Sequence, residues 1–186
     1  MEKPTRASAR RQSAMMAYCG MAAGLSIVIM LLGGVIPAAT YAVPMLCGLL
    51  LLPILLEFGE RAAWATFFAV SSLALMLDFD KEAAFFYLFI GYYPIVKWKL
   101  DKIKGKGWRL AAKLALFTVS MVVMYALLAL LFPVLAALRD FEEMGVIMSA
   151  LFLLAYVFCM MLYDHLLMYC VMLYANKIRP KLKFLK

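Results

Sequence analysis

The chain has 186 residues, of which 67% are hydrophobic and only 16% are charged, and its mean hydropathy is +0.92. This composition excludes an ordinary soluble domain, a disordered chain and a membrane protein with a sizeable aqueous domain. Six membrane-crossing helices need roughly 120 apolar residues, and the chain has about 125. We therefore expect an all-α integral membrane protein with a single transmembrane domain.

Uninterrupted apolar stretches between charged or turn-forming residues predict six membrane-spanning helices. Their approximate ranges are 14–36, 42–58, 61–78, 83–100, 108–138 and 146–176, with basic tails at 1–13 and 177–186. The last two exceed the hydrocarbon thickness of about 30 Å and must tilt, kink or project, and Pro133 is the expected kink in the fifth.

Lysine and arginine are distributed unevenly between alternate gaps of this arrangement. Seventeen of the nineteen fall on the side that holds both termini, and only Lys81 and Arg139 fall on the other. Because basic residues concentrate in cytoplasmic loops, the asymmetry predicts cytoplasmic termini and an even number of spans. The net charge of +8 is then explained by basic residues in the cytoplasmic loops and tails of a membrane protein. We therefore expect no nucleic-acid partner.

The first predicted helix carries a face of small residues, which we call the small face: Ser13, Ala17, Gly20 and Gly24. Small residues four apart share one side of a helix and let another helix approach closely. The residues leave open whether the approaching helix belongs to the same chain or to another subunit.

Prolines and glycines interrupt two of the predicted spans. Pro44 and Pro53 in the second span predict a kinked packing helix or the lining of a cavity, because they leave carbonyl groups without partners inside the helix. In the fourth span Gly91 and Pro94 should weaken the helix locally beside Tyr92, which belongs either to the wall of a pocket or to ordinary packing.

The two predicted outer loops between spans three and four and between spans five and six combine acidic and aromatic residues. Helix capping by Asp80, and by Asp140 with Glu143, is one explanation, and an outward-facing site for cationic or metal-chelated ligands is the other. Short proline-interrupted segments and the densest outer polar residues converge at this face. The expected substrate-binding residues are Thr40, Tyr41, Asp78, Asp80, Glu82, Phe86, Phe141, Glu142 and Glu143.

Asp164 and His165, the only histidine, form an ionisable pair within the sixth span. Such a pair is costly in a membrane, so Asp164 should find a partner, with Lys97, Lys113 or an interfacial amine as candidates. Its predicted depth, near the cytoplasmic edge, favours a structural or subunit-contact role over a ligand or proton-relay role.

The sequence contains no HExxH, GxSxG or P-loop motif and no cluster of cysteine and histidine. We therefore expect neither an enzyme nor a cofactor or resident metal ion. The chain also cannot hydrolyse ATP itself, so active transport would need a separate motor.

The chain resembles the S components of energy-coupling factor (ECF) transporters. The resemblance lies in the predicted span count and orientation, in the small face, and in the stretch from Ile36-Pro37 through Pro44, Gly48, Pro53 and Gly59. The resemblance implies a multi-pass protein of the bacterial cell membrane that captures a vitamin-like micronutrient at its outer face. It also implies docking of helix one on an ECF transmembrane scaffold that works with two ATPase subunits. The alternative is a non-transport partner or assembly factor for another membrane protein, or a protein that binds a lipid-like molecule.

Overall fold

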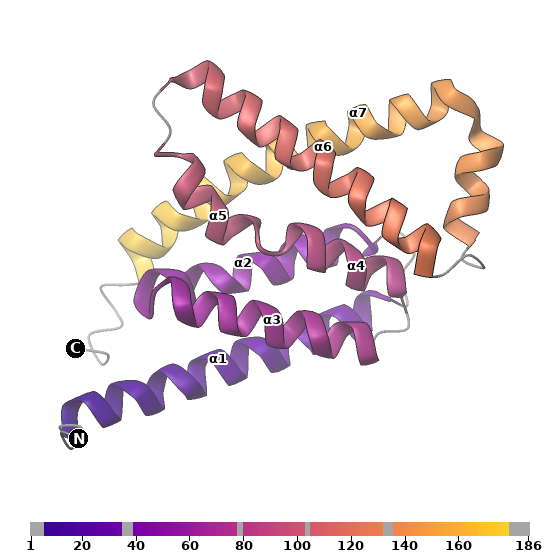
Figure 1. Cartoon of the computed structure of the whole chain (residues 1–186). Helices are drawn as coiled ribbons and strands as arrows, with labels where there is room; N and C mark the ends of the chain where they lie inside the picture. The colour runs from indigo at the N-terminus through magenta and orange to yellow at the C-terminus, as the bar shows by residue number, and fades with distance from the viewer. Residues whose placement is uncertain (1–5, 35–38, 78–79, 103–104, 132–135, 179–186) are drawn as a thin grey trace. The chain divides into compact units, whose positions relative to one another are not determined.

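The computed structural model describes residues 6–34, 39–77, 80–102, 105–131 and 136–178, with side chains over 12–34, 39–77, 80–102, 105, 107–127, 130 and 150–177 (Figure 1). These residues are helical apart from short turns, and no strand occurs among them. The helices are α1 Arg6–Gly33, α2 Ala42–Glu57, α3 Glu60–Leu77, α4 Lys81–Ile90, α5 Tyr93–Leu100, α6 Lys106–Leu131 and α7 Ala136–Leu173, followed by a π-helical turn Tyr174–Ile178.

Three helical stretches within the described chain are long and apolar enough to cross a membrane: Gln12–Gly33, Gly107–Leu127 and Ala150–Lys177. α2 is apolar but has 16 residues, which is about 24 Å at 1.5 Å per residue and short of the hydrocarbon core. The all-helical, membrane-type architecture is therefore confirmed. The count of six spans and the orientation of the termini stay predictions.

The predicted fourth span, 83–100, was wrong as a single helix, because α4 ends at Ile90 and α5 begins at Tyr93. Gly91 closes α4 by donating its N–H to the Tyr87 carbonyl over 2.7 Å. A Cβ atom at position 91 would lie 2.6 Å from that carbonyl oxygen, so only glycine fits. Pro94 has no N–H to continue the helix and sits where the first turn of α5 tolerates it. The expected weakening at Gly91 and Pro94 is thus confirmed.

The boundary between the last two predicted spans also differs. α6 ends at Leu131 and α7 begins at Ala136, so residues 139–143, expected to form a loop, lie inside a helix. The run Ala136-Ala-Leu-Arg consists of good helix formers, which extends the helix upstream of the acidic residues. Pro133, the expected kink, lies outside the described residues.

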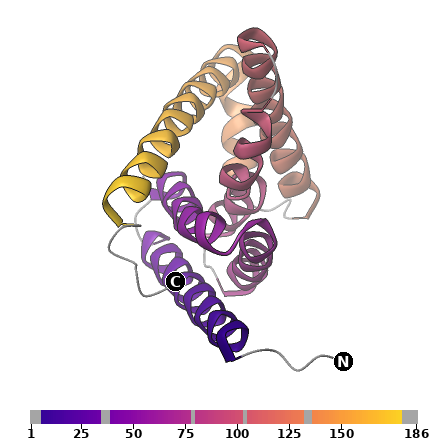
Figure 2. The ribbon, with the colours of Figure 1, turned by 90° about the vertical axis from the view of Figure 1, so that its left-hand side faces the viewer.

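Contacts divide the chain into two compact units, 1–95 with 168–186, and 96–167. In the first unit α1 packs against α2 and α3, α2 also packs against α3 and α4, and α3 packs against α4 (Figures 1 and 2). Seven residues of α2 are buried, among them Cys47, Leu51 and Ile54. α2 therefore packs within the first unit, which is one of the two possibilities that its prolines left open.

The contact between the end of α1 and the start of α2 depends on Gly33. A Cβ atom at this position would lie 2.5 Å from Cγ2 of Val43 and 3.0 Å from its Cβ. Val43 is buried and has a β-branched, stiff side chain, so it has little room to move away. The glycine therefore allows the end of α1 and the start of α2 to meet.

Candidate functional site

Hydrogen bonds join the segment before α2 to the start of α4. The Thr40 hydroxyl donates to Asp80 Oδ2 over 2.8 Å, and the Tyr41 hydroxyl donates to Glu82 Oε1 over 2.6 Å. The other oxygen of Asp80 accepts the backbone N–H of Ala83 over 3.1 Å, as expected of a helix cap. Asp80 therefore serves both as a cap and as a tether between two segments.

An aromatic contact completes this cluster, since the rings of Tyr41 and Phe86 meet edge to face with centroids 5.2 Å apart. We call the five residues the polar latch: Thr40, Tyr41, Asp80, Glu82 and Phe86. All five belong to the expected substrate-binding set, and the structure places them together within the first unit. Asp78 and the side chains of Phe141, Glu142 and Glu143 lie outside the described residues.

Each latch carboxylate accepts a hydrogen bond from a hydroxyl group. An ionised carboxylate only accepts hydrogen bonds, so a ligand at this place must bring donors to compete with Thr40 and Tyr41. The chemistry of the latch therefore favours amines and polyhydroxylated molecules over anions.

The small face of α1 is uncovered within its own unit. Ser13, Ala17, Gly20 and Gly24 are all exposed, and a Cβ atom built at either glycine meets nothing within 4 Å. Of the described α1 glycines, Gly33 rather than Gly20 or Gly24 makes the close helix contact. Among the described residues of the first unit, no helix therefore lies on Gly20 or Gly24 of the small face.

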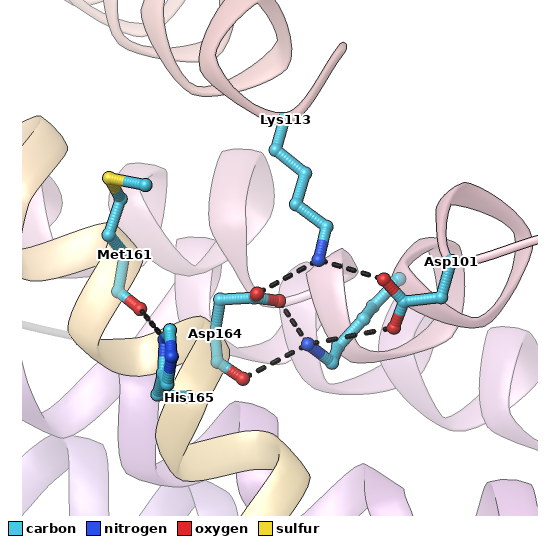
Figure 3. A network of polar contacts seen from close by, with 6 residues as sticks. Asp101, Lys113, Met161, Asp164 and His165 are labelled. Carbon is cyan, nitrogen blue, oxygen red and sulfur yellow. Dashed lines mark hydrogen bonds and ion pairs between the residues drawn. The ribbon is translucent and has the colours of Figure 1, made fainter. Parts of the chain in front are cut away.

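A charge cluster of two lysines and two aspartates lies within the second unit (Figure 3). Lys113 Nζ contacts Asp101 Oδ1 and Asp164 Oδ2, each at 2.8 Å. Lys97 Nζ contacts the Asp164 carboxylate, donates to the Asp164 backbone carbonyl over 3.0 Å and lies 3.7 Å from Asp101 Oδ2. Each lysine therefore faces both aspartates, and the four charges alternate.

The four side chains are largely shielded from solvent, with exposed fractions of 8% for Lys97, 11% for Lys113, 18% for Asp164 and 27% for Asp101. The prediction that Lys97 or Lys113 pairs with Asp164 is confirmed, and both do so. Asp101 was not among the residues that the sequence analysis placed near Asp164. Its spacing of four residues from Lys97 was the available signal.

A pocket of about 430 Å³ adjoins the cluster in the same unit. α6 and α7 line it, and its walls are Arg109, Leu110, Lys113, Leu114, Phe117, Met161, Asp164 and His165. Lys113 and Asp164 belong to both features, so the cluster forms one wall of the pocket. His165 Nδ1 lies 3.3 Å from the Met161 carbonyl, and its ring is exposed (Figure 3).

Arg109 differs from the other cations of this region. Its Nε atom is buried, and among the described residues the guanidinium has neither a hydrogen bond nor an ion pair. A buried donor without a partner is unusual in proteins, and an acceptor that reaches it gains a hydrogen bond. Sequence reasoning had assigned Arg109 to topology and missed it.

The described residues contain no group of three or more His, Cys, Asp or Glu that could hold a metal ion. No protein-family model, curated protein sequence or solved structure matches the chain. Its function is therefore inferred from the polar latch, the small face and the pocket.

Proposed function

We propose that the chain is the substrate-binding membrane subunit of an ECF-type uptake transporter and captures a vitamin-like or other micronutrient small molecule at the outer face of a bacterial cell membrane. The observation that carries the proposal is the polar latch. It draws two carboxylates, two hydroxyls and an aromatic ring from segments 40 residues apart to one place. A small polar site with an aromatic wall suits a water-soluble ligand.

Capture at the latch is an exchange of hydrogen bonds. In the described state Thr40 and Tyr41 satisfy Asp80 and Glu82. A ligand with amine or hydroxyl donors takes over the carboxylates and frees both hydroxyls, which lie just before α2. Ligand binding would thereby be coupled to the position of the connection between α1 and α2.

The proposed partners are a transmembrane scaffold and two ATPase subunits, and the scaffold docks on the small face. The exposure of Gly20 and Gly24 supports this role, because a partner helix could approach the α1 backbone without displacing a neighbour. The same exposure favours the second candidate function, a non-transport partner or assembly factor that uses α1 to bind another membrane protein.

Purification separates the two functions. The tagged full chain is expressed together with its own partners and extracted from those membranes in mild detergent. A membrane scaffold and ATPases should co-purify with it, and it should retain a water-soluble small molecule. Mass spectrometry of the proteins and of the released molecules gives both readouts. A single membrane client without ATPases or a retained solute would support the assembly-factor function and overturn the transporter.

The latch itself is tested with Glu82→Gln and Asp80→Asn, compared with Glu60→Gln as the matched control. Glu60 is an exposed acid at the start of α3, away from the latch. The latch variants should lose the retained molecule while the control keeps it. Equal retention by all three variants would place the ligand elsewhere.

A further inference from the structure

We propose that the pocket between α6 and α7 binds the phosphate group of an anionic phospholipid, with Arg109 as its principal ligand. Nothing in the proposed transport function requires this site, and its residues are separate from the polar latch. All eight residues that line it belong to the second unit.

Charge balance around the pocket calls for one anion. Lys97 and Lys113 are matched by Asp101 and Asp164, and these four side chains neutralise one another. Arg109 then adds one positive charge that no carboxylate of the described chain balances. A phosphodiester carries one negative charge, so its binding would balance the positive charge of Arg109.

The hydrogen-bonding capacity of Arg109 leads to the same ligand. Its buried Nε atom is unpaired in the described structure and would be satisfied by an acceptor in the pocket. A planar guanidinium presents paired donors that match two oxygens of a phosphate group. Asp164 does not repel such an anion strongly, because both lysines already hold its carboxylate.

The remaining walls favour a phosphate that carries an apolar tail. Leu110, Leu114, Phe117 and Met161 line the rest of the pocket, and Leu110 is 44% exposed. Arg109 lies three residues after the start of α6, about 5 Å along the helix, whereas Phe117 lies about 12 Å further. A headgroup at Arg109 would therefore continue into a tail along the apolar side of α6.

The surroundings of Arg109 have the composition of a membrane interface. Trp108, its neighbour, is 78% exposed, and tryptophan is enriched at the level of lipid headgroups. Basic pockets between membrane helices at that level bind acidic headgroups. These observations favour a lipid over free phosphate as the source of the anion.

The test uses the purified full chain in detergent and native mass spectrometry with phosphatidylglycerol, phosphatidylcholine or inorganic phosphate added. We expect phosphatidylglycerol to bind in preference to the zwitterionic lipid. Arg109→Gln should weaken this binding about tenfold or more, which is the effect of losing a hydrogen bond to a charged group. The matched control is Arg61→Gln, which removes the same charge from an exposed site on α3 and should leave binding unchanged.

A second variant, Leu110→Trp, fills the apolar side of the pocket at a partly exposed position and leaves every charge in place. It should also weaken phosphatidylglycerol binding, and it tests the site even if Arg109→Gln fails to fold. Equal binding of the two lipids, or undiminished binding by Leu110→Trp, would overturn the proposal. Displacement of the lipid by millimolar inorganic phosphate would show a free-anion site instead and would also overturn it.

Discussion

The Tyr41 hydroxyl donates to the Glu82 carboxylate over 2.6 Å, although 41 residues separate the two in the chain. Tyr41 precedes α2, and Glu82 lies in the first turn of α4, where a negative charge is also stabilised by the helix dipole. This contact forms only when α2 and α4 are packed, so its removal reports on the assembly of the first unit.

Tyr41→Phe should lower the free energy of unfolding by about 1–2 kcal/mol, because it removes a charge-assisted hydrogen bond from a partly buried carboxylate. The expected fall in melting temperature is roughly 2–4 °C per kcal/mol for a chain of this size. Thermal unfolding in detergent, followed by tryptophan fluorescence, measures it. Tyr169→Phe, at a tyrosine that is 67% exposed, is the control and should melt like the wild type. Identical melting of all three proteins would contradict a stabilising latch.

Gly33→Ala should destabilise the first unit by about 1–3 kcal/mol, since the added methyl group overlaps Val43 in a packed contact. Gly24→Ala, on the same helix, meets nothing within 4 Å and should cost no stability. The double variant Gly33→Ala with Val43→Ala should recover part of the loss, because it removes the overlapping atoms. Similar melting temperatures for Gly33→Ala and Gly24→Ala would mean that α1 does not meet α2 at Gly33.

Asp164→Ala should cost about 2–4 kcal/mol, because it leaves two shielded lysines facing only Asp101. Lys113→Met should also destabilise, by leaving two aspartates with Lys97 alone. The double variant restores equal numbers of positive and negative charges, so it should lose less than the sum of the single variants. Melting temperatures of the four proteins complete the cycle, and strict additivity would show that the charge cluster is not coupled.

Gly20→Leu with Gly24→Leu should abolish co-purification of the proposed scaffold while the isolated chain keeps its melting temperature. The bulky side chains hold a partner helix away from the α1 backbone, which removes close packing worth about 1–2 kcal/mol or more. Loss of stability together with loss of the partner would place the small face in the core of this protein instead.

Reporter fusions after Lys186 and within residues 100–107 should both be cytoplasmic, as the distribution of lysine and arginine predicts. Alkaline phosphatase and fluorescent-protein activities give opposite signals on the two sides of the membrane. An outside signal at either position would overturn the six-span topology.

Features that depend on composition and near neighbours were accessible from the sequence. The membrane character follows from hydropathy, and the break at Gly91 and Pro94 and the cap at Asp80 follow from residues within one helical turn. The sequence also predicted that residues 40–41 and 80–86 lie close together. Successive helices run in alternating directions, so the start of the second span and the start of the fourth lie at the same end of the helices. The pairing of Asp164 with lysine followed from the cost of an isolated charge.

Only the tertiary structure decided which faces of the helices meet. α2 is apolar on all sides, so hydropathy does not reveal the rotation of a helix about its axis or the position where it comes closest to a neighbour. The way α1 and α2 meet puts Gly33 of α1, rather than Gly20, against the neighbouring helix. In the second unit, helix placement brings Asp101 into the charge cluster and leaves the Arg109 guanidinium without a carboxylate partner among the described residues. Both outcomes depend on distances between segments far apart in the chain, which local sequence patterns do not specify.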